Sequence, residues 1–258
     1  MGHPALDLSS KTAVVVGGTS GVGLTIARGL AVAGADVIPT GRRHKLVEQI
    51  ACEIQKMGRK SLAFPCDVGD RRSLEALCDR VCEEFGKVDI LVNSAGITQR
   101  TPILNVSEAE WNRIMETNLT GTLRSCQVFG RKMVERGYGR IINVASLASH
   151  LAFNEVAAYT ASKAAVASLT KSLAVEWARK GVNVNALVPG VFRTDLNAAM
   201  LDGTPRGQEY MVRIPMRRFG QLEELVGATI FLASDSASYV TGHLLAVDGG
   251  FLASGMNQ

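Results

Sequence analysis

Residues 11–40 read KTAVVVGGTSGVGLTIARGLAVAGADVIPT, and this stretch decides the fold. Lys11 to Val16 is an apolar, β-branched run, which predicts a buried strand. Residues 17–23 form a glycine-rich turn, and Leu24 to Ala33 has a helical pattern. Asp36 to Thr40 predicts a second strand. A strand, a glycine turn, a helix and a strand in this order are typical of parallel α/β folds that bind nucleotides.

The turn has the spacing Gly-x-x-x-Gly-x-Gly. Glycines permit a tight turn and a close approach of the backbone, and the N-terminus of the following helix presents free N–H groups to a phosphate. A cluster of glycines also occurs in plain turns, but its position between the first strand and the first helix favours a nucleotide site. The expected cofactor contacts here are Gly17, Thr19, Ser20, Gly21, Val22 and Gly23.

Strand and helix patterns alternate along the rest of the chain. The alternation predicts a single α/β domain over residues 1–258, built as a doubly wound parallel sheet (a Rossmann fold) with helices on both faces. Ligands bind such sheets at the carboxyl ends of the strands, where the motifs of this chain converge. Further strands are expected at residues 61–65, 88–92, 140–145, 183–187 and 244–247, and a long helix at 107–136.

The composition excludes several classes of protein. The net charge of +4 is small and no basic run is longer than a pair, so nucleic acid is not expected as a partner. There is no signal peptide pattern and no apolar run of about 18 residues, which predicts a cytoplasmic protein without a membrane partner. The five cysteines have no paired-ligand spacing and the four histidines are scattered, so we expect reduced thiols and no metal site.

The end of the second strand bears on the choice of cofactor. Folds that bind NAD usually carry an acid there, which binds the ribose 2′-hydroxyl group. Here the strand ends in Thr40-Gly41-Arg42-Arg43 without an acid, and the planar fork of an arginine suits a 2′-phosphate. We therefore expect NADP(H), held at this end by Arg42 and Arg43. The alternative is that both arginines are simply solvated at the start of a helix.

Two further strand ends carry candidate cofactor contacts. Asp67, followed by Val68, can accept a hydrogen bond from an adenine amino group, or it can cap the next helix. Asn93, Ala95 and Gly96 belong to a run of small residues, which lets a ligand pass over the end of the strand.

Three residues farther along the chain predict acid–base chemistry. Ser146 follows an apolar strand, and Tyr159 and Lys163 are four residues apart in an alanine-rich stretch, which places them on one helix face. Free tyrosine has a pKa of about 10, and we expect the ammonium group of Lys163 to lower it. Tyr159 would then exchange a proton with a carbonyl or alcohol oxygen, to which Ser146 donates a hydrogen bond. Tyr-x-x-x-Lys alone is more often a surface pair, but the convergence of motifs argues against that interpretation.

Together these motifs resemble the short-chain dehydrogenase/reductase family over essentially the full length of the chain. The family's Thr-Gly-x-x-x-Gly-x-Gly motif is matched by residues 16–23, with valine in place of the threonine. Its Asn-Asn-Ala-Gly motif is matched by residues 93–96, with serine in place of the second asparagine. Ser146, Tyr159 and Lys163 match the catalytic set, including the step of thirteen residues from serine to tyrosine.

The resemblance implies an oxidoreductase that interconverts a ketone and a secondary alcohol by hydride transfer. It gives Tyr159 the role of acid or base, and Lys163 the additional role of holding the nicotinamide ribose. It also places Asn118 at the fourth catalytic position, where it supports a chain of water molecules that carries the proton onward. Family members of this kind are usually homotetramers, which we expect here. The motif on the nicotinamide side is matched by Pro189, Gly190 and Thr194.

Finer features resemble the branch that contains gluconate 5-dehydrogenases, although 3-oxoacyl-carrier-protein reductases share much of the pattern. This implies a keto sugar acid such as 5-ketogluconate as the substrate, with a 3-oxoacyl thioester or a hydrophobic or aryl ketone as the alternative. A dinucleotide-sensing regulator without catalysis is a minor alternative. We expect residues 191–216 to form a lid, and His150 or Arg193 to supply a cation for the acid group. The expected substrate contacts are Ser146, His150, Phe153, Tyr159 and Val191.

Overall fold

The computed structural model describes residues 4–194 and 197–255, and its centre is a parallel sheet of six strands in the order β2-β1-β3-β4-β5-β6. Strand β1 pairs with β2 on one side and with β3 on the other, so the winding reverses there and the sheet is doubly wound, as predicted. The strands are β1 (Thr12–Val16), β2 (Asp36–Thr40), β3 (Ile90–Asn93), β4 (Gly139–Val144), β5 (Val182–Pro189) and β6 (Leu244–Val247).

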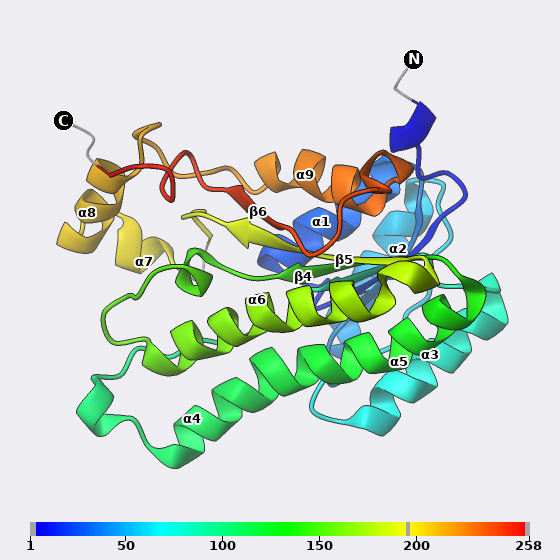
Figure 1. Ribbon diagram of the computed structural model, residues 1–258, viewed down its shortest axis with the longest axis horizontal. Helices are drawn as coiled ribbons and strands as arrows, with labels where there is room; N and C mark the ends of the chain where they lie inside the picture. The colour runs from blue at the N-terminus through cyan, green and yellow to red at the C-terminus, as the bar shows by residue number, and fades with distance from the viewer. Residues whose placement is uncertain (1–3, 195–196, 256–258) are drawn as a thin grey trace.

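Helices cover both faces of this sheet (Figure 1). Successive side chains of a strand point to opposite faces, and β1 shows the result. Its Val15 packs in one apolar cluster with Ile26 and Leu30, whereas Val14 packs in a second cluster with Leu77 and Phe129. The first cluster involves α1 (Gly21–Val32), α2 (His44–Lys56) and α9 (Glu224–Ala233), and the second involves α3 (Arg71–Phe85), α5 (Gly121–Arg136) and α6 (Ala157–Trp177).

The strand predicted at residues 61–65 is not formed, and Pro39 supplies the reason. N–H groups alternate between the two sides of a strand: Asp36 donates to Lys11 on the β1 side, and Val37 donates to Lys60 on the other side, at 3.1 Å. Pro39 lies on the same side as Val37 and has no N–H group, so the next bond of the ladder is missing. The segment still runs beside β2, because the Thr40 hydroxyl donates to the carbonyl oxygen of Phe64 at 2.6 Å.

The helix predicted at 107–136 contains a π-helical turn. It begins as α4 (Glu108–Met115), widens over Glu116–Thr120 and continues as α5. Ser107 caps its start by accepting a hydrogen bond from the Glu110 N–H group at 3.1 Å. Single π turns inside helices occur frequently at functional sites, and this one holds the buried Asn118.

The predicted lid, residues 191–216, contains two short helices, α7 (Ala198–Leu201) and α8 (Pro205–Arg213). Both lie at one end of the sheet, beyond the carboxyl end of β5 (Figure 1). Residues 195 and 196 of this segment lie outside the described residues. Asn197 closes the turn before α7, since its side chain accepts a hydrogen bond from the Thr194 N–H group at 2.7 Å and donates to the Phe192 carbonyl at 2.8 Å.

Across the described ranges, no helix combines the length and the apolar character needed to cross a membrane. The same residues contain no group of three or more His, Cys, Asp or Glu side chains placed to hold a metal ion. All five cysteines are free thiols.

Candidate active site

A cavity of about 770 Å³ opens at the carboxyl ends of the strands. Its walls come from the glycine turn, the segments after β2, β3, β4 and β5, the first turns of α6, and α8. The structure thus brings together residues that are far apart in the sequence. The predicted residues that line it are Gly17, Thr19, Ser20, Gly21, Val22, Gly23, Arg42, Arg43, Asp67, Val68, Ala95, Gly96, Ser146, Phe153, Tyr159, Lys163, Pro189, Gly190, Val191 and Thr194.

Three predicted site residues, Asn93, Asn118 and His150, do not line the cavity. Asn93 is buried, and its side-chain amide donates to Asn143 at 2.9 Å on the α5 face of the sheet, because the alternation of the strand turns it away from the ligand side. His150 is exposed and follows the 3₁₀ turn Leu147–Ser149. In that turn the Ser149 hydroxyl donates to the Lys163 carbonyl at 2.8 Å, so Ser149 faces α6 and His150 faces solvent.

Asn118 also lies outside the cavity wall, and it joins the loop after β3 to α6. Its side-chain oxygen accepts from the Ile97 N–H group at 2.8 Å, and its amide donates to the Ile97 carbonyl at 2.9 Å and to Ser162 at 3.0 Å. A methyl group placed on Gly96 would be 3.4 Å from the Asn118 oxygen and 3.5 Å from the Lys163 ammonium nitrogen. Asn118 therefore positions the cavity wall next to Lys163. A role for it in a chain of water molecules stays a prediction.

The glycine turn has the shape of a phosphate cradle. Gly17 has a φ of +82°, and a methyl group there would be 2.6 Å from the Ala95 nitrogen; one on Gly23 would be 2.2 Å from the Gly17 oxygen. The side chain of Ser20, the N-cap of α1, makes no capping hydrogen bond, which leaves the first-turn N–H groups for a ligand. The turn is held to β2 by backbone bonds from Gly17 and Gly18 to the Thr40 carbonyl, at 2.9 and 3.0 Å.

Arg43 lies beside this cradle. Its guanidinium donates to the Ser20 hydroxyl at 2.9 Å and to the Thr19 hydroxyl at 3.4 Å. Arg42 lines the same end of the cavity and is exposed. Asp67 does not cap the following helix, since that position is taken by Asp70, whose carboxylate accepts from the Arg72 N–H group. The end of the cavity beside β2 therefore carries two cations and the Asp67 carboxylate.

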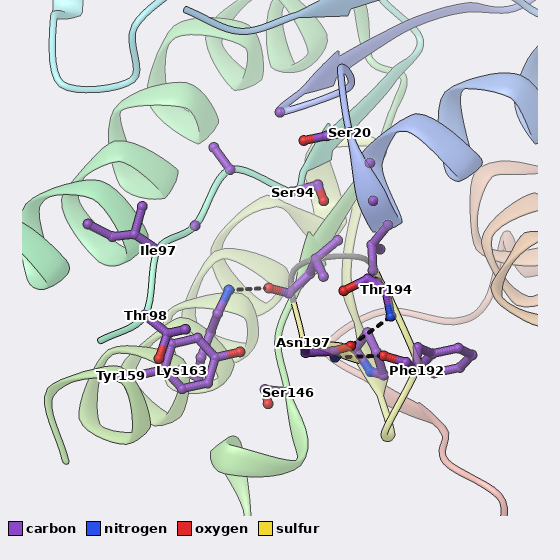
Figure 2. Close-up of a pocket in the computed structure, with 18 of the residues that line it drawn as sticks. Ser20, Ser94, Ile97, Thr98, Ser146, Tyr159, Lys163, Phe192, Thr194 and Asn197 are labelled. Carbon is purple, nitrogen blue, oxygen red and sulfur yellow. Dashed lines mark hydrogen bonds between the residues drawn. The ribbon is translucent and has the colours of Figure 1, made fainter. Parts of the chain in front are cut away.

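At the other end, Ser146, Tyr159 and Lys163 lie close together (Figure 2). Lys163 is buried, its ammonium nitrogen donates to the Val144 carbonyl at 2.7 Å, and it lies 5.9 Å from the centre of the Tyr159 ring. Burial disfavours the charged form of an amine and lowers the pKa of Lys163 to about 8. The Lys163 side chain can therefore lose or regain a proton near neutral pH.

The prediction that Lys163 lowers the pKa of Tyr159 is wrong. The pKa of Tyr159 is raised, mainly because burial disfavours the phenolate, and the nearby phenol of Tyr210 adds to this. A hydrogen bond with the Ser146 side chain acts in the opposite direction and lowers it. Lys163 is not among the groups that shift this pKa, and its ammonium is directed to the Val144 carbonyl. In this structure Tyr159 is therefore set up as a proton donor.

Several residues of the cavity wall were not named individually from the sequence, although Asn197, Arg206 and Tyr210 fall in the segment predicted as a lid. Thr98 and Asn197 are drawn with the catalytic side chains in Figure 2, and both line the cavity. Arg206 and Tyr210 line it from α8, four residues apart on one helix face. Pro205 and the spacing of four residues indicate a helix with both side chains on one face. Only the folded structure shows that this face lines the cavity near Tyr159. Arg193 is not part of the wall and forms an ion pair with Asp202 at 2.7 Å.

Comparison with known proteins adds a family and relatives. Residues 16–252 match the family model described as Enoyl-(Acyl carrier protein) reductase. The chain is 42% identical to 2-dehydro-3-deoxy-D-gluconate 5-dehydrogenase of Bacillus subtilis, over 97% of this chain and 98% of that one. It is 39% identical to D-threitol dehydrogenase of Mycolicibacterium smegmatis, over 95% and 94%. A solved gluconate 5-dehydrogenase of Burkholderia cenocepacia, in complex with NADP and tartrate, superimposes with a TM-score of 0.93 at 38% identity, covering 97% and 98%.

Proposed function

The chain belongs to the short-chain dehydrogenase/reductase family of oxidoreductases, and from that premise we propose that it interconverts a keto sugar acid and the corresponding secondary alcohol with NADP(H). One observation carries the proposal: a single cavity joins the glycine turn and two arginines at one end to Ser146, Tyr159 and Lys163 at the other. A sensor that only binds a dinucleotide would not need this second end.

The residues present fit NADP(H). The first-turn N–H groups of α1 and the space kept by Gly17 and Gly23 suit a diphosphate, and Arg42 and Arg43 suit a 2′-phosphate. Pro189, Gly190 and Thr194 line the part of the wall that follows β5. When bound, the cofactor supplies the hydride for the reaction.

The protein side chains handle the proton and the substrate oxygen. The Ser146 hydroxyl donates a hydrogen bond to the carbonyl oxygen and stabilises the charge that develops on it. Tyr159, whose raised pKa keeps it protonated, donates its proton to that oxygen in the reducing direction. Lys163, with a pKa of about 8, can restore the proton that Tyr159 gives up. Asn118 keeps the wall beside Lys163 in place.

The substrate class rests on the relatives and on the wall of the cavity. Two of the compared proteins bear the names of sugar-acid dehydrogenases, and the D-threitol dehydrogenase makes an uncharged polyol or ketose the second candidate. The wall contains polar groups such as Thr98 and Arg206, beside a cluster of the Phe153, Tyr210 and Phe251 rings. Because these rings are apolar, a 3-oxoacyl thioester or a hydrophobic ketone is the alternative substrate.

The direct test is oxidation of NADPH, with NADH in parallel, against four carbonyl compounds. These are 5-ketogluconate, an uncharged ketose such as L-sorbose, a 3-oxoacyl thioester and an aryl ketone. Preferred turnover of 5-ketogluconate with NADPH is the expected result. Preferred turnover of any of the others would refute the sugar-acid assignment, and a failure to oxidise NADPH with every ketone tested would favour a sensor.

The NADP preference has its own test. The exchange Arg42→Ala should weaken NADPH binding by about 10-fold or more and leave NADH binding nearly unchanged, since a charged hydrogen bond to a phosphate is worth roughly 1.5–3 kcal/mol. Equal losses for both nucleotides would remove Arg42 from the 2′-phosphate site.

We also expect a homotetramer in the cytoplasm. The family resemblance supports the tetramer, and the five free thiols suit a reducing compartment. Light scattering of the purified protein would determine the number of subunits, and a mass other than that of four subunits would contradict the expectation.

A further inference from the structure

We propose that Arg206 binds the carboxylate of the substrate and thereby selects sugar acids over uncharged ketoses. The inference rests on the proposed function and deepens it. It assigns acid recognition to α8, which lines the same cavity as the first turns of α6.

Arg206 is held in place by the start of α8. Thr204 caps this helix by accepting from the Gly207 N–H group at 3.0 Å, and its hydroxyl donates to the Met200 carbonyl at 2.6 Å, which ties α8 to α7. Arg206 is therefore in the first turn of a capped helix. Its guanidinium lies 5.9 Å from the centre of the Tyr210 ring, one turn farther along.

Tyr210 is itself fixed from behind. Its ring lies 6.1 Å from the ring of Phe153 and 6.3 Å from that of Phe251, centre to centre, in tilted arrangements. Three aromatic rings from three parts of the chain thus support the surface on which the guanidinium lies. Because the Tyr210 ring is packed in this way, it can orient the Arg206 guanidinium without a carboxylate partner.

Arg206 differs from the other arginines of the cavity in its charge environment. Arg100, another arginine of the wall, forms an ion pair with Glu155, and Arg42 and Arg43 belong to the end beside β2. Among the residues that the structure describes, no Asp or Glu lies within ion-pair distance of Arg206, although it is half-buried. A half-buried cation that faces a cavity without a counter-charge is complementary to an anionic ligand.

Arg206 also lies on the helix face that is near the proposed proton donor, Tyr159. The Tyr210 phenol is close enough to Tyr159 to contribute to its raised pKa, so the inner face of α8 lies next to the proton donor. Arg206 and Tyr210 share that face and line the same cavity as Ser146. A substrate held by its carboxylate at Arg206 would extend its carbon chain toward Ser146 and Tyr159.

The test compares Arg206→Gln with Arg213→Gln. Arg213 is on the same helix and pairs with Glu209 at 2.8 Å on the exposed side, so the control makes the same change of charge away from the cavity. For Arg206→Gln, kcat/KM for 5-ketogluconate should fall roughly 10- to 150-fold, the range of a charged hydrogen bond, mainly through KM. Turnover of L-sorbose should be unchanged, and Arg206→Lys should recover part of the loss.

A second measurement does not depend on turnover. D-gluconate is titrated by calorimetry into the NADP⁺ complexes of the wild type and of both variants. Weaker binding only in Arg206→Gln supports the carboxylate site, even if the wild type proves to reduce no sugar acid and the proposed function falls. Wild-type reduction of 5-ketogluconate that Arg206→Gln leaves intact would uphold the proposed function and overturn the role of Arg206. Equal losses for 5-ketogluconate and L-sorbose would show a structural role only and would also overturn it.

Discussion

Replacing Lys163 by methionine should abolish activity and change how stability depends on pH. Lys163 is the buried ammonium beside Tyr159, and its pKa is lowered from 10.5 to about 8 because burial disfavours its charge. In the unfolded chain the same amine keeps its ordinary pKa. Below pH 8 the amine is charged in both states, so the folded state carries the full cost of a buried charge.

The sign and the size of the pH dependence of stability follow from the difference between the pKa values of Lys163 in the folded and unfolded states. Between about pH 8 and 10.5 the unfolded chain binds a proton that the folded chain has released, so the free energy of unfolding of the wild type rises with pH. The difference between 10.5 and about 8 corresponds to about 3 kcal/mol in total, of which about 2.5 kcal/mol falls between pH 7 and pH 10. This part of the pH dependence is absent in Lys163→Met.

The assay is urea unfolding at fixed protein concentration, at several values between pH 7 and pH 10. The quantity to plot is the difference in unfolding free energy between the wild type and the variant, because the other titrating groups cancel in it. The absolute offset also contains the lost bond to the Val144 carbonyl, whereas the slope does not. Lys171→Met, an exposed lysine of the same helix, controls for the exchange itself. A flat difference for Lys163→Met would refute the argument that Lys163 is charged and destabilising at neutral pH.

Three further predictions concern single side chains. Tyr159→Phe should reduce kcat by about 10²- to 10⁴-fold, the usual contribution of a general acid, while NADPH titrations show nearly unchanged binding; substantial residual turnover would remove Tyr159 from proton transfer. Gly23→Ala places a methyl group 2.2 Å from the Gly17 oxygen and should abolish NADPH binding, whereas Gly227→Ala in α9 meets no atom within 4 Å and should leave it intact. Ser107→Ala removes the cap of α4 and should lower the free energy of unfolding by about 1 kcal/mol, and an unchanged denaturation midpoint would contradict the capping role.

The parts of the fold that follow from local pattern could be predicted from the sequence. The strand, glycine turn and helix at residues 11–33 and the spacing of Tyr159 and Lys163 depend on neighbours in the chain, and the structure shows them as expected. Pro39 was a readable signal against a ladder with residues 61–65, because it lacks an N–H group on that side. The direction of the Tyr159 pKa depends on burial by several elements, which no local pattern contains.

The candidate site was predictable to the same extent. Residues next to strand ends were placed correctly, except that the side chain of Asn93 follows the alternation of β3 to the opposite face. His150 was misplaced because a single 3₁₀ turn decides its direction. Arg206 could not be found, since its importance depends on how α8 packs on Phe153 and Phe251, which are distant in the sequence.

The strand order has a consequence for folding. Even the closest paired strands join residues far apart in the chain: Thr12 pairs with Asp36, 24 positions away (36 − 12), and Ala13 pairs with Ile90, 77 positions away (90 − 13). Such contacts require the closure of long loops before they stabilise anything, so we expect slow folding compared with helical bundles. The glycine turn packs against Ala95, so the phosphate cradle is complete only after β3 has joined β1. NADPH should therefore slow the unfolding of the finished protein and leave the early steps of refolding unaffected.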